Sequence, residues 1–345
     1  MTVSNITRQQ LVLERWLAEQ GAAGSARLLA QHKLSGGAIQ ENWALDVYFE
    51  GGPHAGVQQL VLRSDAPSAV ASSRSRIEEF ALFRAAHAAG VRVPEPLWLG
   101  ADPGLLGKCF FIMRRSPGTA AGHRLVKDDD LVPDRPGLAR QLGEQLARIH
   151  SLVPPRADLA FLGQPAQQPA LALLDGVRRW LDENQVRRPV LEWALAWLQR
   201  AAPQTSRQVL CHNDFRTGNY LVEAGQVSAV LDWEFADWGD PLADIGWFCA
   251  PCWRFGQRTA EAGGIGPREA FLQGYEQQSG HAVDRQALHY WEVMATLRWS
   301  LIALQQSARH LRGQESSLEL ALTGHLQPEL ELDILDMTRE TSPCA

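Results

Sequence analysis

The chain lacks the features that mark secreted, membrane-spanning and disordered proteins. Only five of its 345 residues are cysteine, too few for a disulfide framework in a chain this long. The N-terminus shows no basic and then apolar signal, and no uncharged apolar stretch approaches membrane-spanning length. With 45% hydrophobic and 21% charged residues, extensive disorder is excluded. We therefore expect an ordinary soluble, cytoplasmic protein with enough length for a large core.

Strong net charge is also missing, and so is a complete cysteine motif. The formal charge of −6 gives no electrostatic case for nucleic acid or an anionic membrane as a partner. Cys249 and Cys252 have the spacing of a redox or zinc half-site, but no second cysteine pair or paired histidine accompanies them. We predict that these two residues are structural, reduced thiols.

A block near the middle of the chain carries most of the chemical information. An apolar run leads into His212 and Asp214, and Asn219 follows Asp214 by five positions. A second apolar run, after a turn at Gly225, leads into Asp232. Magnesium–phosphate chemistry needs such a set, because one carboxylate orients and deprotonates a hydroxyl while an amide oxygen and a second carboxylate hold the metal. The alternative, a β-hairpin with scattered surface acids, leaves the agreement between apolar pattern and polar spacing unexplained.

This block resembles the catalytic loop of the aminoglycoside phosphotransferase and choline kinase superfamily, a small-molecule branch of the protein-kinase-like fold. Asp232 matches that family's metal-binding aspartate, and Gly239-Asp240-Pro241 with Asp244 matches the motif that follows it. The resemblance extends over roughly residues 34–337. The C-terminal segment 326–331 resembles the branch related to the kinase-like part of acyl-CoA dehydrogenase fusion proteins.

The resemblance implies an α+β, bilobal fold, with a small antiparallel sheet and one helix in a nucleotide-binding lobe at 1–116. A larger, mainly helical lobe at 117–345 would carry catalysis and substrate binding. Within the first lobe we predict strands at 44–49, 59–63 and 109–114 and a helix at about 75–89. A capping box at Thr7-x-x-Gln10 predicts the start of an earlier helix.

Apolar periodicity predicts several helices in the second lobe. One contains Leu138, Leu142 and Leu146 and ends near His150, which we interpret as a hydrogen-bonded core histidine. Further helices are expected within 174–198, around 271–275, after a cap at Asp284, and at 329–337.

Nucleotide-binding residues follow from the resemblance. Two glycines in the Ser35-Gly36-Gly37 segment would let backbone N–H groups approach a triphosphate. Arg63 stands where kinases usually carry a lysine, and a guanidinium can also clamp phosphate oxygens. Its expected partner is Glu79, with Glu78 as the neighbour that could be confused with it. Residues 110–118 resemble the hinge that binds adenine, which makes Met113, either hinge-adjacent or core, and Arg115 candidates.

The remaining candidate residues receive roles by the same resemblance. Asp214 would be the catalytic base, Asn219 and Asp232 would hold Mg²⁺, and His212 would brace the loop. Arg216 is close enough to the base in sequence to touch substrate or phosphate. Three further acids, Asp240, Asp244 and Glu234, would hold the catalytic residues in place. Asp244 would accept backbone N–H bonds from the loop. For Glu234 the alternative is a solvent-facing position.

Together these residues predict transfer of the γ-phosphoryl group of ATP, or of GTP, to a hydroxyl of a small molecule. A nucleotide-binding pseudokinase without turnover should have lost Asp214, Asn219 or Asp232, and all three are present. A hydrolase that uses water as the acceptor is the other alternative. Arginines and acids are mixed along the expected substrate lobe, which suits a neutral or anionic acceptor at least as well as a polycation. The sequence favours neither a monomer nor a homodimer.

Overall fold

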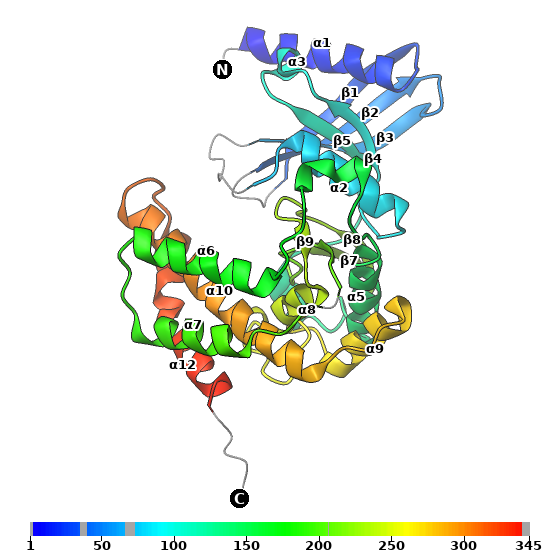
Figure 1. Cartoon of the computed structure of the whole chain (residues 1–345). Helices are drawn as coiled ribbons and strands as arrows, with labels where there is room; N and C mark the ends of the chain where they lie inside the picture. Colours follow the sequence, from blue (N-terminus) through cyan, green and yellow to red (C-terminus); the bar gives the residue numbers. More distant parts are fainter. Residues whose placement is uncertain (1–2, 35–39, 66–72, 206, 340–345) are drawn as a thin grey trace, which may run out of the picture. The chain divides into compact units, whose positions relative to one another are not determined.

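The computed structural model describes residues 3–34, 40–65, 73–205 and 207–339, and the chain divides into two compact units (Figure 1). The first unit comprises residues 1–118, 157–161 and 228–235, and the second comprises the rest. The predicted boundary at residue 116 lies close to the first break. However, the segment 228–235 belongs to the first unit, not to a continuous lobe at 117–345, because Asp232 and Glu234 bond side chains of the first unit.

A five-stranded antiparallel sheet forms the centre of the first unit, in the order β1-β2-β3-β5-β4. Its strands are β1 (Ser25–Lys33), β2 (Gln40–Glu50), β3 (Gly56–Asp65), β4 (Pro96–Gly100) and β5 (Phe110–Arg114). The three predicted strands coincide with β2, β3 and β5. Strands β1 and β4 were not predicted.

Two helices cover opposite faces of this sheet (Figure 1). On one face Trp16 of α1 (Val3–Gln20) packs edge-on against Phe110, with ring centroids 4.9 Å apart. On the other, Phe80 and Phe83 of α2 (Arg76–Ala88) pack on Phe111. The side chains of Phe110 and Phe111 therefore lie on opposite faces of the sheet, because successive side chains of a strand alternate between the two faces. The short helices α3 (Pro103–Leu106) and η1 (Ala157–Leu162) follow along the chain.

Two helix starts test the capping predictions. Helix α2 begins after Ser75, whose side chain and that of Glu78 form a complete capping box. Helix α1, by contrast, begins at Val3, so the predicted start at Thr7 is wrong. A Thr-x-x-Gln pattern also fits the interior of a helix, and here the helical backbone continues through it.

The second unit is mainly helical. Its α-helices are α4 (Gly122–Lys127), α5 (Arg135–Ile149), α6 (Pro169–Glu183), α7 (Pro189–Ala201), α8 (Pro241–Cys249), α9 (Arg268–Ser279), α10 (Arg285–Leu311), α11 (Leu318–Thr323) and α12 (Gln327–Met337). Short strands and turns complete it. Strand β6 (Val209–Cys211) pairs with β9 (Asp237–Gly239), and β7 (Tyr220–Glu223) pairs with β8 (Gln226–Val230), of which residues 228–230 belong to the first unit. The segments η2 (Pro251–Trp253) and η3 (Gly324–Leu326) are single turns. All the helices predicted for this region are present, and Asp284 caps α10 as expected.

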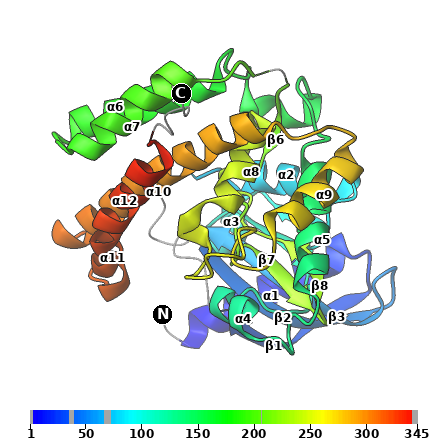
Figure 2. The ribbon, with the colours of Figure 1, turned by 90° about the horizontal axis from the view of Figure 1, so that it is seen from below.

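Close helix packing in the second unit depends on glycine at two positions. A Cβ on Gly143 of α5 would meet the carbonyl oxygen of Phe271 at 2.0 Å, and a Cβ on Gly246 of α8 would meet the backbone of Trp291 at 2.7 Å. Helices α5 and α9 therefore lie side by side (Figure 2), as do α8 and α10. This packing places the C-terminal end of α5 beside α9 and brings α10 against α8, the two contacts on which the site below is built.

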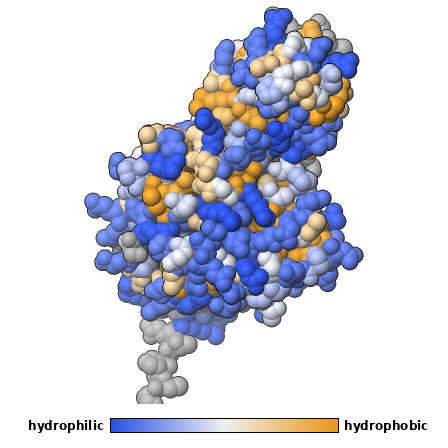
Figure 3. Space-filling model, turned by 90° about the vertical axis from the view of Figure 1, so that its right-hand side faces the viewer, coloured by the Kyte–Doolittle hydropathy of each residue, from blue (hydrophilic) through white to orange (hydrophobic). Residues whose placement is uncertain are grey.

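The surface shows no single extended apolar area on the face seen in Figure 3, where hydrophobic side chains occur in separate groups among hydrophilic ones. Within the described part of the chain, none of the helices combines the length and the apolar character needed to cross a bilayer.

Candidate active site

The carboxylate of Asp214 is held by three side-chain donors of the second unit. Its Oδ1 accepts hydrogen bonds from Arg216 Nε and from Trp247 Nε1, both at 3.2 Å. Its Oδ2 accepts one from Asn219 Nδ2 at 2.5 Å. Three donors on one partly buried carboxylate fix its orientation. A carboxylate held in a fixed orientation is what a general base requires.

Asn219 is oriented so that its two amide atoms have different partners. Nδ2 donates to Asp214 twice, to the carboxylate and to the backbone carbonyl oxygen at 2.9 Å. The amide oxygen accepts no hydrogen bond from the described residues. Amide and carboxylate oxygens are the ligands that Mg²⁺ prefers, so the orientation of Asn219 fits a metal ligand.

The loop that carries Asp214 is anchored from behind by Asp244 of α8. The carboxylate of Asp244 accepts the backbone N–H of His212 at 2.6 Å and that of Asn213 at 2.7 Å. These are the bonds expected from the sequence. Asn213 has a left-handed backbone with φ of 63°, a conformation that asparagine tolerates better than most residues. His212 is buried, and its Nδ1 accepts the backbone N–H of Asp214 at 3.3 Å, a geometry that braces the loop.

Asp244 is in turn held by a buried histidine. His150 Nε2 lies 3.2 Å from the Asp244 carboxylate, and Nδ1 lies 2.9 Å from the Tyr275 hydroxyl. Burial lowers the pKa of His150, so the ring is neutral at neutral pH. Because a carboxylate only accepts, Nε2 donates and Nδ1 accepts from the tyrosine. Burial alone would raise the pKa of Asp244, but the bonds from His150 and the loop backbone outweigh it and lower that pKa.

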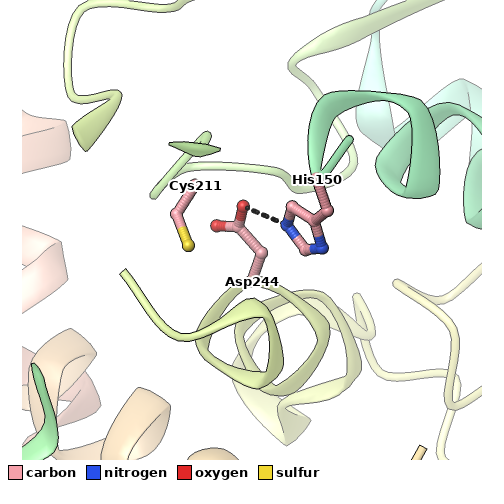
Figure 4. A group of neighbouring side chains, drawn as sticks. All are labelled: His150, Cys211 and Asp244. Carbon is pink, nitrogen blue, oxygen red and sulfur yellow. Dashed lines mark hydrogen bonds and ion pairs between the residues drawn. The ribbon is translucent and has the colours of Figure 1, made fainter. Parts of the chain in front are cut away.

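His150, Cys211 and Asp244 are also close enough together to suggest a metal centre, with ligand atoms within 4.8 Å of one another (Figure 4). Their hydrogen bonds argue against one. Both oxygens of Asp244 and both ring nitrogens of His150 have partners, and the Cys211 thiol donates to the Asp240 carbonyl oxygen at 3.3 Å. Burial also raises the pKa of this thiol well above its usual value. The group is a hydrogen-bonded support for the loop.

The first unit contains a second cluster of site residues, centred on Arg63 of β3. Its guanidinium donates to Glu79 through Nε and through Nη2 at 2.8 Å, to the Asn42 side chain at 3.3 Å, and to Asp232 Oδ1 at 3.0 Å. Arg63 thus pairs with the acid expected from the sequence, and also with the predicted metal ligand.

Burial makes this cluster electrostatically strong. Arg63 is 3% exposed and Glu79 is fully buried, and Glu79 also forms an ion pair with Arg76. Burial alone would lower the pKa of Arg63, but the carboxylates of Glu79 and Asp232 outweigh it and raise that pKa. Arg63 therefore stays charged beside Asp232. The neighbouring Glu78 has a different task, because it completes the cap of α2.

Glu234 is buried, so the alternative of a solvent-facing side chain is wrong. Its carboxylate accepts hydrogen bonds from Gln40 and from Ser73 Oγ, the latter at 2.7 Å. Burial raises its pKa. Asp232, two residues earlier, has a left-handed backbone with φ of 58°. Such a conformation costs energy in a residue other than glycine and persists where the surroundings enforce it, often at functional sites.

The other candidates lie elsewhere or serve the scaffold. Met113 is buried in β5, and Arg115 forms an ion pair with Asp46 at 2.8 Å, so neither joins the Arg63 cluster. Ser35, Gly36 and Gly37 lie outside the described residues. Asp240 is buried, which raises its pKa, and caps α8 through the Leu242 N–H.

The thiols of Cys249 and Cys252 have pKa values raised by burial. They are free cysteines, and neither belongs to the group of possible metal ligands found among the described residues.

Two residues of the site were not predicted from the sequence. Trp247 bonds the Asp214 carboxylate, and Asn42 bonds Arg63. Trp247 lies in a continuous apolar helix, where a tryptophan is expected to be part of the core. Asn42 lies on β2 directly opposite Arg63, so correct pairing of β2 with β3 would have revealed it.

The fold is protein-kinase-like. The sequence gives the class of protein, because residues 33–291 match the phosphotransferase enzyme family. The chain belongs to that family, whose members are kinases that act on hydroxyl groups.

Solved structures confirm the α+β kinase-like fold. A Ralstonia eutropha protein assigned to the aminoglycoside phosphotransferases superimposes with a TM-score of 0.76 at 20% identity, covering 95% of this chain and 97% of that one. A thermostable mutant of an aminoglycoside phosphotransferase, in a ternary complex with ADP and hygromycin B, gives a TM-score of 0.59 at 18% identity, with 93% and 98% covered.

The chain is also similar in sequence to parts of two larger proteins. Mouse acyl-CoA dehydrogenase family member 10 is 30% identical over 200 residues, which cover 56% of this chain and 18% of that protein. Rat acyl-CoA dehydrogenase family member 11 is 25% identical over 307 residues, covering 83% and 38%. The resemblance to acyl-CoA dehydrogenase proteins is thus confirmed, and the chain spans well under half the length of these relatives.

Proposed function

We propose that this chain is a Mg²⁺-dependent small-molecule kinase that transfers the γ-phosphoryl group of ATP to a hydroxyl of its acceptor. The observation that carries the proposal is the Asp214 carboxylate, which three donors orient on a loop that Asp244 anchors. Asp214 accepts a hydrogen bond from the acceptor hydroxyl and takes its proton late, as charge develops on the attacking oxygen.

The other residues bind the nucleotide and its metal. By the family resemblance, the amide oxygen of Asn219 and the carboxylate of Asp232 would hold Mg²⁺, which would neutralise charge on the phosphate oxygens. In the structure Asp232 pairs with Arg63, so Arg63 balances this carboxylate and orients phosphate beside it. The relative that was crystallised with ADP supports the choice of an adenine nucleotide.

Acceptor-dependent ADP release tests the proposal. The full chain with Mg²⁺ and ATP is incubated with a panel of hydroxyl-bearing metabolites, and the same panel is repeated with GTP. The proposal expects release with at least one acceptor and its loss in Asp214→Asn. Nucleotide consumption that needs no acceptor would instead identify a hydrolase, and binding of Mg-ATP without any turnover would identify a pseudokinase.

A further inference from the structure

Among the residues that the structure describes, Arg298 of α10 has no carboxylate within ion-pair distance. It is partly buried, and its Cζ lies 4.8 Å from the ring centroid of Trp247, the geometry of a cation–π contact. Within the described residues it makes no hydrogen bond and no ion pair. Neighbouring arginines of the second unit differ, because Arg216 pairs with Asp214 and Arg268 pairs with Glu261 and Glu292.

The position of Arg298 links it to the proposed catalytic base. The indole that it covers donates its N–H to Asp214, so one tryptophan has the carboxylate at its edge and the guanidinium on its face. Arg216 lies 4.7 Å from the ring of Trp253, and the Trp247 and Trp253 rings are 5.2 Å apart. Two guanidinium groups are therefore held on neighbouring indoles around a single catalytic carboxylate.

We propose that Arg298 binds an acidic group, a carboxylate or a phosphate, on the acceptor whose hydroxyl is phosphorylated at Asp214. The proposal rests on the proposed function and identifies its substrate class. A guanidinium matches the two oxygens of such a group, and the indole beneath it fixes its orientation before the acceptor arrives.

Charge and burial support this assignment. Burial lowers the pKa of Arg298, although Asp244 and Asp214 oppose the shift. Arginine nevertheless remains protonated at neutral pH, and a partly buried cation without a partner is costly unless a ligand supplies one. The acceptor is therefore a hydroxylated acid.

The rival explanation is that Arg298 only balances the charge of Asp214 and Asp244. Calorimetric titration of the full chain separates the two. The probes are glycerate, β-hydroxybutyrate and ε-hydroxycaproate, each compared with its primary amide, and glycerol phosphate compared with glycerol. If Arg298 is purely structural, its substitution should change the affinity for an acid and for its neutral analogue equally. If Arg298 recognises the acid, its substitution should change only the affinity for the acid.

We expect at least one acid to bind more tightly than its neutral analogue, by roughly 10- to 100-fold for a charge-assisted contact. Arg298→Met should abolish that preference, Arg298→Lys should keep part of it, and Arg285→Met, an exposed arginine on the same helix, should leave it unchanged. The proposal is overturned if no acid binds better than its neutral analogue, or if Arg298→Met keeps the preference or weakens both probes equally.

Two controls separate a failure of this proposal from a folding defect of the variant and from a failure of the proposed function. If Arg298→Met does not fold, as judged by its melting curve, the wild-type preference and the Arg298→Lys variant decide the question, and an undiminished preference in Arg298→Lys counts against the proposal. The kinase assignment fails separately, as a lack of acceptor-dependent ADP release. A chain that binds acids selectively through Arg298 without transferring phosphate would disprove the proposed function alone.

Discussion

Trp247 shows how one side chain can connect the fold to the chemistry. Its ring is part of the core of the second unit, while its N–H bonds the Asp214 carboxylate. The close approach of α10 to α8 at Gly246 fixes the helix that carries it. We therefore regard Trp247 as a positioning residue for the base, one that the apolar pattern of α8 conceals.

Trp247→Phe tests this role because it retains an aromatic ring and removes only the N–H donor. We expect kcat to fall by about 10-fold, the cost of one hydrogen bond to a charged group, with little change in KM for Mg-ATP. Trp299→Phe, the same substitution in the same aromatic cluster, is the control and should leave kcat nearly unchanged. An unaltered kcat in Trp247→Phe would remove it from the site.

Asp214→Asn tests the assignment of the base itself. The variant should still bind Mg-nucleotide but lose turnover by roughly 10²- to 10⁴-fold, the range for a positioned acid or base. Steady-state ADP release with the acceptor found in the screen measures the effect. Near-native turnover in this variant would mean that another group accepts the proton.

At the scale of elements, the sequence predicted best what depends on strong local patterns. Helix α2, strands β2, β3 and β5, and the long helix after Asp284 all have marked apolar periodicity or a clear cap. Strand β1 was missed because most of its residues are exposed and show no alternation. Strand β4 was missed because it is short and begins with proline.

The residues of the candidate site also fall into two groups, those that local sequence patterns identify and those that they do not. Residues with a fixed spacing on one loop, such as Asp214 and Asn219, can be identified from the sequence. Glu79 was predicted as the partner of Arg63 from the family resemblance, although Glu78 lies beside it in the first turn of α2, and the packing of that helix brings Glu79 to Arg63. Trp247, Asn42 and Arg298 contribute through contacts between distant segments, for which one sequence contains no spacing rule.

Glu292 gives α10 a pH-dependent element of stability. It is buried, and its Oε1 accepts no hydrogen bond within the described residues, although Arg268 lies 3.3 Å away. Burial raises the pKa of Glu292 to about 7, from 4.5. Because the folded value is the higher one, the folded chain keeps a proton that the unfolded chain has released. Glu292 therefore lowers stability progressively as the pH rises through this interval.

Glu292→Gln should remove this pH-dependent loss of stability. Relative to the wild type, the variant should gain stability between about pH 5 and pH 8, by at most about 3 kcal/mol. Urea unfolding at both pH values measures the difference, and Glu269→Gln, an exposed glutamate of α9, is the control. A stability difference that does not change with pH would contradict the raised pKa.

At the scale of the whole molecule, the distribution of charge bears on the acceptor. Enzymes for polycationic antibiotics need a concentrated acidic surface beside the base. Here acids of the second unit are paired with arginines, as in Arg178–Glu192, Arg187–Asp182 and Arg268–Glu261. Common aminoglycosides should therefore be poor acceptors. Saturable, efficient phosphorylation of kanamycin at micromolar concentration, measured as ADP release, would show that this reasoning fails.

The proposed kinase binds Mg-ATP through Asp232 and uses Asp214 as the base in phosphoryl transfer. The melting temperature with and without Mg-ATP tests this assignment most directly, measured for the wild type, Asp232→Ala, Asp214→Asn and Glu50→Ala, which removes an exposed carboxylate of the first unit as a control. A ligand that binds only the folded state raises the melting temperature. We predict that the rise persists in Asp214→Asn and Glu50→Ala and disappears in Asp232→Ala. An undiminished rise in Asp232→Ala, or no rise in the wild type, would contradict the account.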